Sequence, residues 1–423
     1  MYTDKNVKLI NYLIALIPLS LILGNLIVNI NIILICVVGI IICGKETFRI
    51  KKNYEILISF FFIYVIIVTA TNNIPKFDLS PKYQENLLKS IFNLRFLLLF
   101  FVINTLIKND KLNLKPFLYS ALFLSLLIAI DLIIQVAFGK NLIGLEITAD
   151  RPSSFFGNEH IAGAYLQKFA LFLLFWFAYK NKNDLKFLII VSLFFIPVLL
   201  TGNRMPMLIF LSSIFIYFLI EKKIKIFFFF LLISTIVILF SLKFPLVNRL
   251  DVQLRNFADA TLELFHKAPK LFLEKNYNDT KIGIGHSGYL IHFNSGIQIW
   301  KENKIFGKGL KSFPLNCKYG DNQTCNSHPH NYIIEIMLDT GLVGLILIYS
   351  VFLISLMNFL KLYFLIYNQR IKLLTLPFFL IMFFEFFPFR SSGSFFTTSV
   401  STIIFLFLAI FINVEKIKNF YKI

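Results

Sequence analysis

The sequence lacks the patterns by which many transferases bind nucleotides or metal ions. It has no Walker motif and no Asp-x-Asp pair. Its His, Cys, Asp and Glu residues do not cluster at the spacings of metal ligands. These absences argue against an ATP-driven enzyme and against a nucleotide-sugar transferase. We therefore predict a protein that uses no metal and no other cofactor.

Acidic residues are also scarce, with 23 Asp and Glu against 42 Lys and Arg, which gives a formal net charge of +19. In a soluble protein this excess would suggest nucleic acid as a partner. Here the lysines fall in short clusters between apolar runs, and no basic face with interleaved aromatic residues appears outside those runs. We predict no nucleic-acid partner and interpret the clusters as signals of membrane orientation.

Polar sequence is scarce as well, because 57% of the residues are hydrophobic and the mean hydropathy is +0.74. Runs of about 17–25 apolar residues can cross a hydrocarbon core about 30 Å thick. The sequence predicts an all-α, polytopic transmembrane helix bundle, with spans in 1–242 and 331–423 and a large outer loop at 243–330. We expect about twelve spans, near residues 9–24, 26–43, 56–71, 90–107, 116–138, 160–179, 187–202, 205–220, 224–242, 331–359, 372–389 and 395–413.

Short basic connections follow the even-numbered spans, as at Lys180, Lys182 and Lys186 after the sixth. Such connections mark the cytoplasmic side, so we expect both termini there and membrane lipids around the bundle. The other connections then lie outside the cytoplasm. They carry nearly all the unusual polar chemistry of the chain and comprise 72–89, 139–159, 203–204, 243–330 and 390–394.

The loop 243–330 is too long to be a simple connection. Apolar residues recur at helical spacing from Leu254 to Phe265 and, less regularly, at Ile291, Ile297 and Trp300, before Gly307 and Gly309 interrupt the pattern. We expect two or three amphipathic helices. They would form either a lid over a cleft for a lipid-linked substrate or a small extramembrane cap.

The four cysteines fall into two pairs. Cys36 and Cys43 lie in an apolar run and are expected to be inert packing residues. Cys317 and Cys325 lie in the outer loop. A disulfide between them is expected in an oxidising compartment, and two free thiols in a reducing one.

The segment from Asn326 to Gly344 joins the polar loop to a long apolar run. Pro329 predicts the first turn of a helix, with Ser327 or His328 near the cap and His330 at the water boundary. The positive end of the helix dipole keeps a histidine neutral, and a neutral imidazole can take a proton from a hydroxyl. The alternative is an ordinary polar helix cap.

Below this segment Asn331, Glu335 and Asp339 recur at every fourth residue, so one face of the helix is polar. We expect this face to point into the bundle. Arg95, Asp131 and Glu385 also fall inside predicted spans and should be paired or face a cavity. We expect Arg95 to pair with Asp131, and Glu385 to face the same cleft as Arg390.

Helix starts and arginines gather at the outer connections. We expect Asn158 to cap the sixth span and Asn203 the eighth, while the turn 390–394 opens the twelfth. Helix N-termini attract anions, and arginine forks bind phosphate oxygens in pairs. Arg151, Arg204 and Arg390 thus predict a diphosphate site at the outer boundary. Alternatively, these arginines simply extend to the membrane interface.

Several of these motifs resemble the O-antigen ligase and polymerase superfamily of bacterial envelope glycosyltransferases. Its histidine motif matches His330-Asn331 followed, after nine residues, by Gly341-x-x-Gly344. The remaining matches are Arg204-Met-Pro-Met-Leu208, Arg151 with Phe156-Gly157-Asn158, the Cys317 and Cys325 pair before the histidines, and Ser392-Gly393-Ser394-Phe395-Phe396. The likeness extends over the whole topology, with the large outer loop before the histidine helix.

The resemblance implies a metal-independent glycosyltransferase in the bacterial inner membrane, with its active site in the periplasm. The donor would be a glycan on undecaprenyl diphosphate. In a ligase the acceptor is lipid A-core, whereas a polymerase extends another lipid-linked repeat unit. Relatives that glycosylate proteins, and a transporter of lipid-linked glycan, are the remaining alternatives.

The resemblance also implies roles for individual residues. His330 would be the catalytic base, and Arg151 and Arg204 would bind the donor diphosphate. Asn158, His328, Asn331 and Arg390 join the predicted substrate site. Ligases often carry another arginine late in the outer loop, but here no arginine follows Arg255 within that loop; Lys308 or Lys311 could replace it as a point charge.

Overall fold

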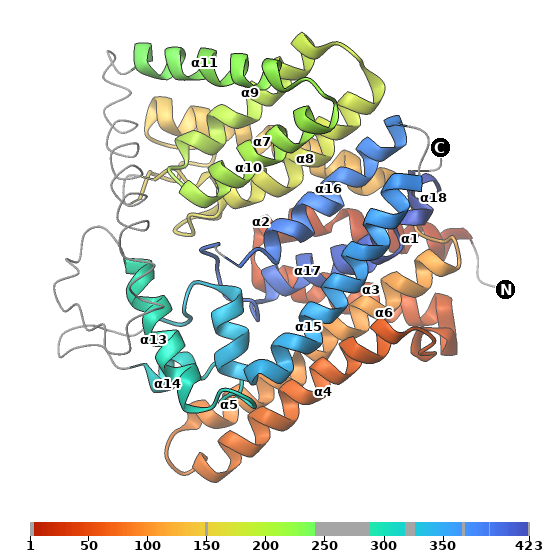
Figure 1. The fold of residues 1–423 in the computed structure, drawn as a ribbon, viewed down its shortest axis with the longest axis vertical. Coiled ribbons are helices and arrows are strands. Elements are labelled where there is room, and N and C mark those ends of the chain that lie inside the picture. The colour runs from red at the N-terminus through yellow and green to blue at the C-terminus, as the bar shows by residue number, and fades with distance from the viewer. Residues whose placement is uncertain are drawn as a thin grey trace.

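The computed structural model describes residues 4–148, 151–241, 288–317, 326–365, 369–388 and 390–421. Within these ranges the regular elements are helices, and the isolated bridges Lys140–Glu146 and Thr148–Arg151 are not part of any strand. The predicted all-α bundle is therefore confirmed (Figure 1). Its α-helices are α1 (Asp4–Ala15), α2 (Ile17–Leu23), α3 (Asn25–Cys43), α4 (Asn53–Asn73), α5 (Pro81–Phe92), α6 (Leu94–Lys108), α7 (Lys115–Phe138), α8 (Ala162–Lys180), α9 (Asp184–Leu200), α10 (Arg204–Ile220), α11 (Ile224–Ser241), α13 (Gly288–Glu302), α14 (Phe313–Asn316), α15 (Tyr332–Leu365), α16 (Gln369–Glu385), α17 (Thr398–Ile412) and α18 (Ile417–Tyr421).

The helices have the length and composition of a multi-pass membrane protein. Six described helical segments are long and apolar enough to cross a membrane, and α1 with α2, bent by 43°, would make a seventh. Shorter apolar helices include α10, α17 and the described start of α11. The expected number of about twelve spans remains a prediction. Residues 81–89, expected within an outer loop, belong to α5, which continues into α6 with only Asn93 between them.

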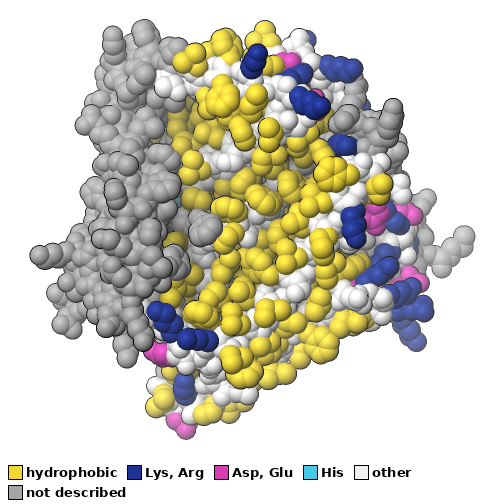
Figure 2. Space-filling model, viewed as in Figure 1, with side chains coloured by type: hydrophobic (Ala, Val, Ile, Leu, Met, Phe, Trp, Pro, Cys, Tyr) yellow, Lys and Arg dark blue, Asp and Glu magenta, His cyan; other side chains and the backbone are white. Residues whose placement is uncertain are grey.

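The outer surface of the bundle is apolar, as a lipid-facing surface must be. Large aliphatic and aromatic side chains are exposed on several helices, for example Leu26, Ile189, Ile346 and Phe364. Figure 2 shows such side chains spread across the middle of one face, with charged side chains gathered toward its margins.

One end of the bundle brings together both ends of the chain and the connection between α6 and α7 (Figure 1). Leu114 N donates to Phe420 O at 2.8 Å, and Asn11 Nδ2 donates to Lys111 O at 3.0 Å. The opposite end contains the start of α15 and the segments that contact it. The expected polar motifs are concentrated there.

The apolar spacing at Ile297 and Trp300 does form a helix, α13. This helix packs on the first turns of α15, where Ile299, Phe313, Ile334 and Leu338 form a small separate core. The helix expected around 254–265 lies outside the described residues.

The helix α15 is broken at Gly341, whose backbone has φ +66° and ψ −169°. The break leaves backbone groups without helical partners, and the segment 304–309 supplies them. Lys308 N and Gly309 N donate to Leu338 O and Asp339 O, both at 2.9 Å, and Leu342 N donates to Lys304 O at 2.9 Å. The loop after α13 is thus bonded into the middle of α15.

The expected pair between Arg95 and Asp131 is not formed. Arg95 donates to Asn29 Oδ1, Phe92 O and Thr398 Oγ1, while Asp131 accepts from Leu142 N and Ser154 Oγ at 2.8 and 2.6 Å. Each charge meets polar groups near its own helix end, so pairing across helices is unnecessary. Asp131 consequently anchors the loop that leads to Arg151.

Candidate active site

His330 lies just before α15 and not within its first turn. The helix begins at Tyr332, and Asn331 Oδ1 accepts a hydrogen bond from Ile334 N at 3.1 Å, which is the bond of an N-cap residue. Pro329 therefore precedes the cap, and the expected cap at Ser327 or His328 is wrong. His330 has φ +57°, and its carbonyl accepts from Ser392 N at 2.8 Å. Few residues other than glycine adopt this conformation.

Three imidazoles meet at this point. The ring centroid of His330 lies 4.2 Å from that of His328 and 5.1 Å from that of His292, which projects from α13. Asn326 Nδ2 lies 2.6 Å from His292 Nε2 and 3.2 Å from His330 Nε2. Among the described residues, no group of three His, Cys, Asp or Glu side chains has the arrangement of a metal site.

Burial and, after it, the neighbouring His328 lower the pKa of His330 to about 4. The pKa values of His292 and His328 are also lowered to about 4, mainly by burial. The three rings are therefore neutral near pH 7. The helix dipole was expected to keep His330 neutral. In the structure, the main causes of its low pKa are burial and the neighbouring histidine ring.

The polar face of α15 is buried and points into the protein, as expected. Asn331, Glu335 and Asp339 are each less than 5% exposed. Asn331 Nδ2 donates to Pro388 O and Arg390 O, and Asp339 accepts from the backbone of Lys311 and Ser312.

Glu335 occupies the middle of this face. It accepts from Ser394 Oγ at 2.5 Å and Phe395 N at 2.6 Å, and pairs with Lys311 Nζ at 3.4 Å. Lys311 also donates to Ser394 Oγ, and its charge helps lower the pKa of His328. Lys311 therefore brings a positive charge to the histidines, whereas Lys308 pairs with Glu302.

Arg151 and Arg204 belong to a second group of residues at the starts of α8 and α10. Asn203, in the expected cap position before α10, donates from Nδ2 to His160 O at 2.8 Å. The charge of Arg151 helps lower the pKa of His160, after burial. The loop 151–161 and the turn before Arg204 are thus adjacent.

Asn158 does not cap α8. The helix begins at Ala162, Ile161 occupies the cap position, and Asn158 is exposed. Its backbone lies in the turn that follows the short 3-10 helix Ser154–Phe156. A role for Asn158 in binding substrate remains a prediction.

Arg390 does not open α17, which begins at Thr398. Its side chain is 9% exposed and pairs with Glu385 at 2.9 Å, while Lys168 of α8 pairs with the same carboxylate oxygen at 3.1 Å. The expected proximity of Glu385 and Arg390 is present. Sequence reasoning missed Lys168, although a charge inside the span expected at 160–179 was the signal that could have found it.

The helix α8 connects the two groups. Lys168 lies six residues beyond Ala162, so its Cα is about 9 Å along the helix from the end that bears the Arg151 loop. Through Glu385 and Arg390 it reaches the loop that contacts Asn331 and His330. The residues around Arg151, Arg204 and His330 therefore lie toward the same end of the bundle.

Cys317 is disulfide-bonded, whereas Cys36 and Cys43 are free and buried. The expected partner, Cys325, lies outside the described residues. Cys317 also packs beside the core that joins α13 to α15.

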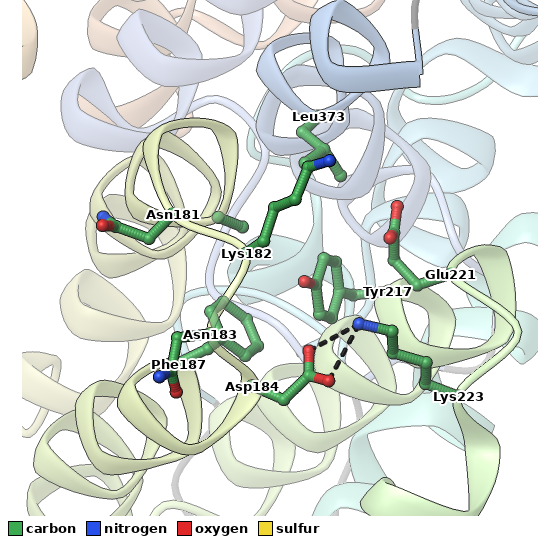
Figure 3. A pocket seen from close by; sticks show the side chains of 10 residues that line it. Asn181, Lys182, Asn183, Asp184, Phe187, Tyr217, Glu221, Lys223 and Leu373 are labelled. Atoms are coloured by element: carbon green, nitrogen blue, oxygen red, sulfur yellow. Dashed lines mark hydrogen bonds and ion pairs between the residues drawn. The ribbon is translucent and has the colours of Figure 1, made fainter.

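A cavity of about 440 Å³ lies at the opposite ends of α8 and α10. It is lined by Lys182, Asp184, Tyr217 and Lys223, among others, and Asp184 and Lys223 form an ion pair across it (Figure 3). None of the predicted site residues lines this cavity, so it is not the site that the motifs predict.

Residues 187–349 match the model of a protein family described as O-antigen ligase. The matched segment includes Arg204, His330 and the break at Gly341, and excludes Arg151 and Arg390. No curated protein matches the chain.

Proposed function

We propose that the chain is a membrane glycosyltransferase of the O-antigen ligase type, the family whose model resembles residues 187–349, and that it transfers a glycan from undecaprenyl diphosphate to an acceptor sugar hydroxyl. The observation that carries this proposal is the neutral, half-buried imidazole of His330 at a polar end of an apolar bundle. Such a group can accept a proton near neutral pH.

In the proposed reaction, the acceptor oxygen attacks the anomeric carbon of the donor sugar. The bond from that carbon to the diphosphate oxygen breaks, the acceptor proton passes to His330, and undecaprenyl diphosphate departs. Asn326 marks the position of the accepting lone pair, since its amide lies 3.2 Å from His330 Nε2. An acceptor hydroxyl that displaces this amide would meet the same nitrogen.

Arg151 and Arg204 would bind the diphosphate and stabilise the negative charge that develops as it leaves. The adjacency of their segments supports this role, because Arg151 lies close enough to His160 to lower its pKa, and Arg204 directly follows Asn203, whose side chain donates to His160 O. Lys311 is our candidate for the further cation that ligases carry in the outer loop. This chemistry fits a donor whose leaving group is already activated.

We place the site on the periplasmic face of the bacterial inner membrane and both termini in the cytoplasm. The basic connections that follow the even-numbered spans support this orientation. The acceptor is proposed to be lipid A-core, which defines a ligase. Repeat-unit polymerisation is the alternative, favoured because no arginine follows Arg255 in the outer loop, where ligases often carry one.

Deletion of the gene, followed by gel analysis of lipopolysaccharide, distinguishes these functions. Loss of a ligase leaves core without O-chain while long polymer accumulates on the carrier lipid. Loss of a polymerase leaves core that bears a single unit. Wild-type protein should restore the pattern and His330→Ala should not; full restoration by the alanine variant would refute an essential role for His330.

A further inference from the structure

Lys168, Glu385 and Arg390 form a buried ion cluster that the proposed chemistry leaves without a role. Their side chains are 10%, 2% and 9% exposed, and both cations contact Glu385 Oε1, at 3.1 and 2.9 Å. Burying three charges in an apolar bundle is costly, and apolar residues of similar volume often stabilise a protein equally well. Stability alone is therefore a weak explanation for the cluster.

The cluster fixes the segment that follows α16. Arg390 Nη1 donates both to Glu385 Oε1 and, at 3.1 Å, to Phe384 O, which closes the chain back on the end of the helix. Lys168 joins the same carboxylate to α8. The guanidinium also lies 5.6 Å from the centre of the Tyr332 ring, at the start of α15.

The same segment supports the backbone of the candidate base. Asn331 Nδ2 donates to Pro388 O at 2.8 Å and Arg390 O at 3.1 Å, and Ser392 N donates to His330 O at 2.8 Å. His330 has a backbone conformation that is unfavourable for a residue with a side chain, and such a conformation persists only where the surroundings impose it. These hydrogen bonds reach His330 from a segment held by Arg390.

We propose that Lys168, Glu385 and Arg390 are positioning residues that hold His330 and its imidazole in the orientation for proton transfer. The cluster acts through Pro388 and residues 390–392 and does not touch the substrate. This role replaces the direct contact between Arg390 and diphosphate that the sequence suggested. The effect of the cluster on proton transfer rests on the proposed function. Its effect on the orientation of His330 does not.

Glu385→Gln tests the proposal, because glutamine keeps the shape of the side chain and removes the charge that both cations share. The matched control is Glu55→Gln. Glu55 is 1% exposed and pairs with Lys108 near the opposite end of the bundle, far along the chain from His330. Two quantities are measured in purified protein: the rate of glycan transfer, and the rate at which diethyl pyrocarbonate modifies His330, determined by peptide mass spectrometry.

We expect Glu385→Gln to lower kcat by roughly 10–100-fold, the size of effect expected when a catalytic group is misplaced, with little change in the KM for donor. His330 should become several-fold more reactive toward the reagent, while Glu55→Gln leaves both rates close to those of wild type. Arg390→Lys keeps the charge, so its transfer and modification rates should lie between those of the two glutamine variants. It replaces Glu385→Gln as the test if that variant does not fold.

Unchanged modification of His330 in the folded cluster variants would overturn the proposal, as would equal effects from Glu55→Gln. Because the modification rate needs no substrate, it decides the positioning role even if wild-type protein shows no transfer. Absence of transfer by wild type would refute only the proposed function.

Discussion

At the scale of single residues, the site depends on a histidine that is neutral because it is buried among other histidines. Its polarity was evident from the sequence, but its backbone conformation was not. The φ of +57° at His330 depends on a hydrogen bond from Ser392, which is distant in sequence. A short motif cannot reveal a constraint imposed from another part of the chain.

The pH dependence of transfer follows from the lowered pKa. A base must be deprotonated, so a pKa of about 4 keeps His330 active at all pH values above that figure. The groups that act on His330 are His328, which lowers the pKa, and Ser392 and Glu335, which raise it. We expect kcat/KM to stay level from about pH 8 to about pH 5 and to fall below that. A decline centred near 6.5, the ordinary histidine value, would contradict this assignment.

Arg204→Lys separates charge from geometry at the proposed diphosphate site. Lysine keeps one positive charge but cannot form two parallel hydrogen bonds to phosphate oxygens. We expect most of the transfer activity to be lost, with a rise in the KM for donor, measured in membranes with equal amounts of each protein. Lys186→Arg, in a connection expected on the other face, is a control. Wild-type turnover by Arg204→Lys would refute the role.

At the scale of elements, the break in α15 joins the loop after α13 to the helix that follows the catalytic segment. The sequence predicted the polar face of α15 because the four-residue spacing of Asn331, Glu335 and Asp339 is a local property. The sequence did not predict the backbone hydrogen bonds between α15 and residues 304–309, because these groups are brought together only in the folded chain. The glycine motif thus has a structural explanation at Gly341.

Gly341→Ala should weaken the fold. Glycine alone adopts φ +66° without strain, and an added Cβ would overlap Ile305 O. We expect a loss of about 2–4 kcal/mol in stability from strain and displaced packing, measured as a lower Tm in detergent. Gly144→Ala is the matched control, since Gly144 also has positive φ but has open space around its Cβ. Equal shifts in the two variants would argue against a role for the close contact.

Two other expectations, a helix cap and an ion pair between helices, were wrong for reasons that lie in the local structure of the elements. Asn158 is not a cap because α8 begins later, at Ala162. Arg95 and Asp131 do not pair, because polar groups close to each satisfy them separately. Sequence spacing indicates that a buried charge needs a partner, but it does not identify the partner.

At the scale of the whole molecule, hydropathy alone predicted the class of fold, because apolar runs of this length can be buried only in a membrane. The assembly of the site was less predictable. Connections distant in sequence approach one another at one end through α8, α10, α15 and α16. Lys168 shows the limit most clearly, since its role depends on Glu385 more than two hundred residues away.

The proposed orientation places the large outer loop in an oxidising compartment, and Cys317 is disulfide-bonded. We expect Cys325 to be its partner. In unreduced, denatured protein a thiol reagent should label Cys36 and Cys43 alone. Labelling of Cys317 and Cys325 under those conditions would contradict the bond.

The central claim is that the imidazole of His330 drives transfer of a lipid-linked glycan in a single bundle. Purified wild-type protein and His330→Ala, reconstituted with undecaprenyl-diphosphate-linked glycan and lipid A-core, test it by the rate at which glycan appears on the acceptor. We predict transfer by wild type and a rate reduced by about 100-fold or more in the variant. Equal rates, or no transfer to any sugar acceptor by the wild-type protein, would contradict the claim.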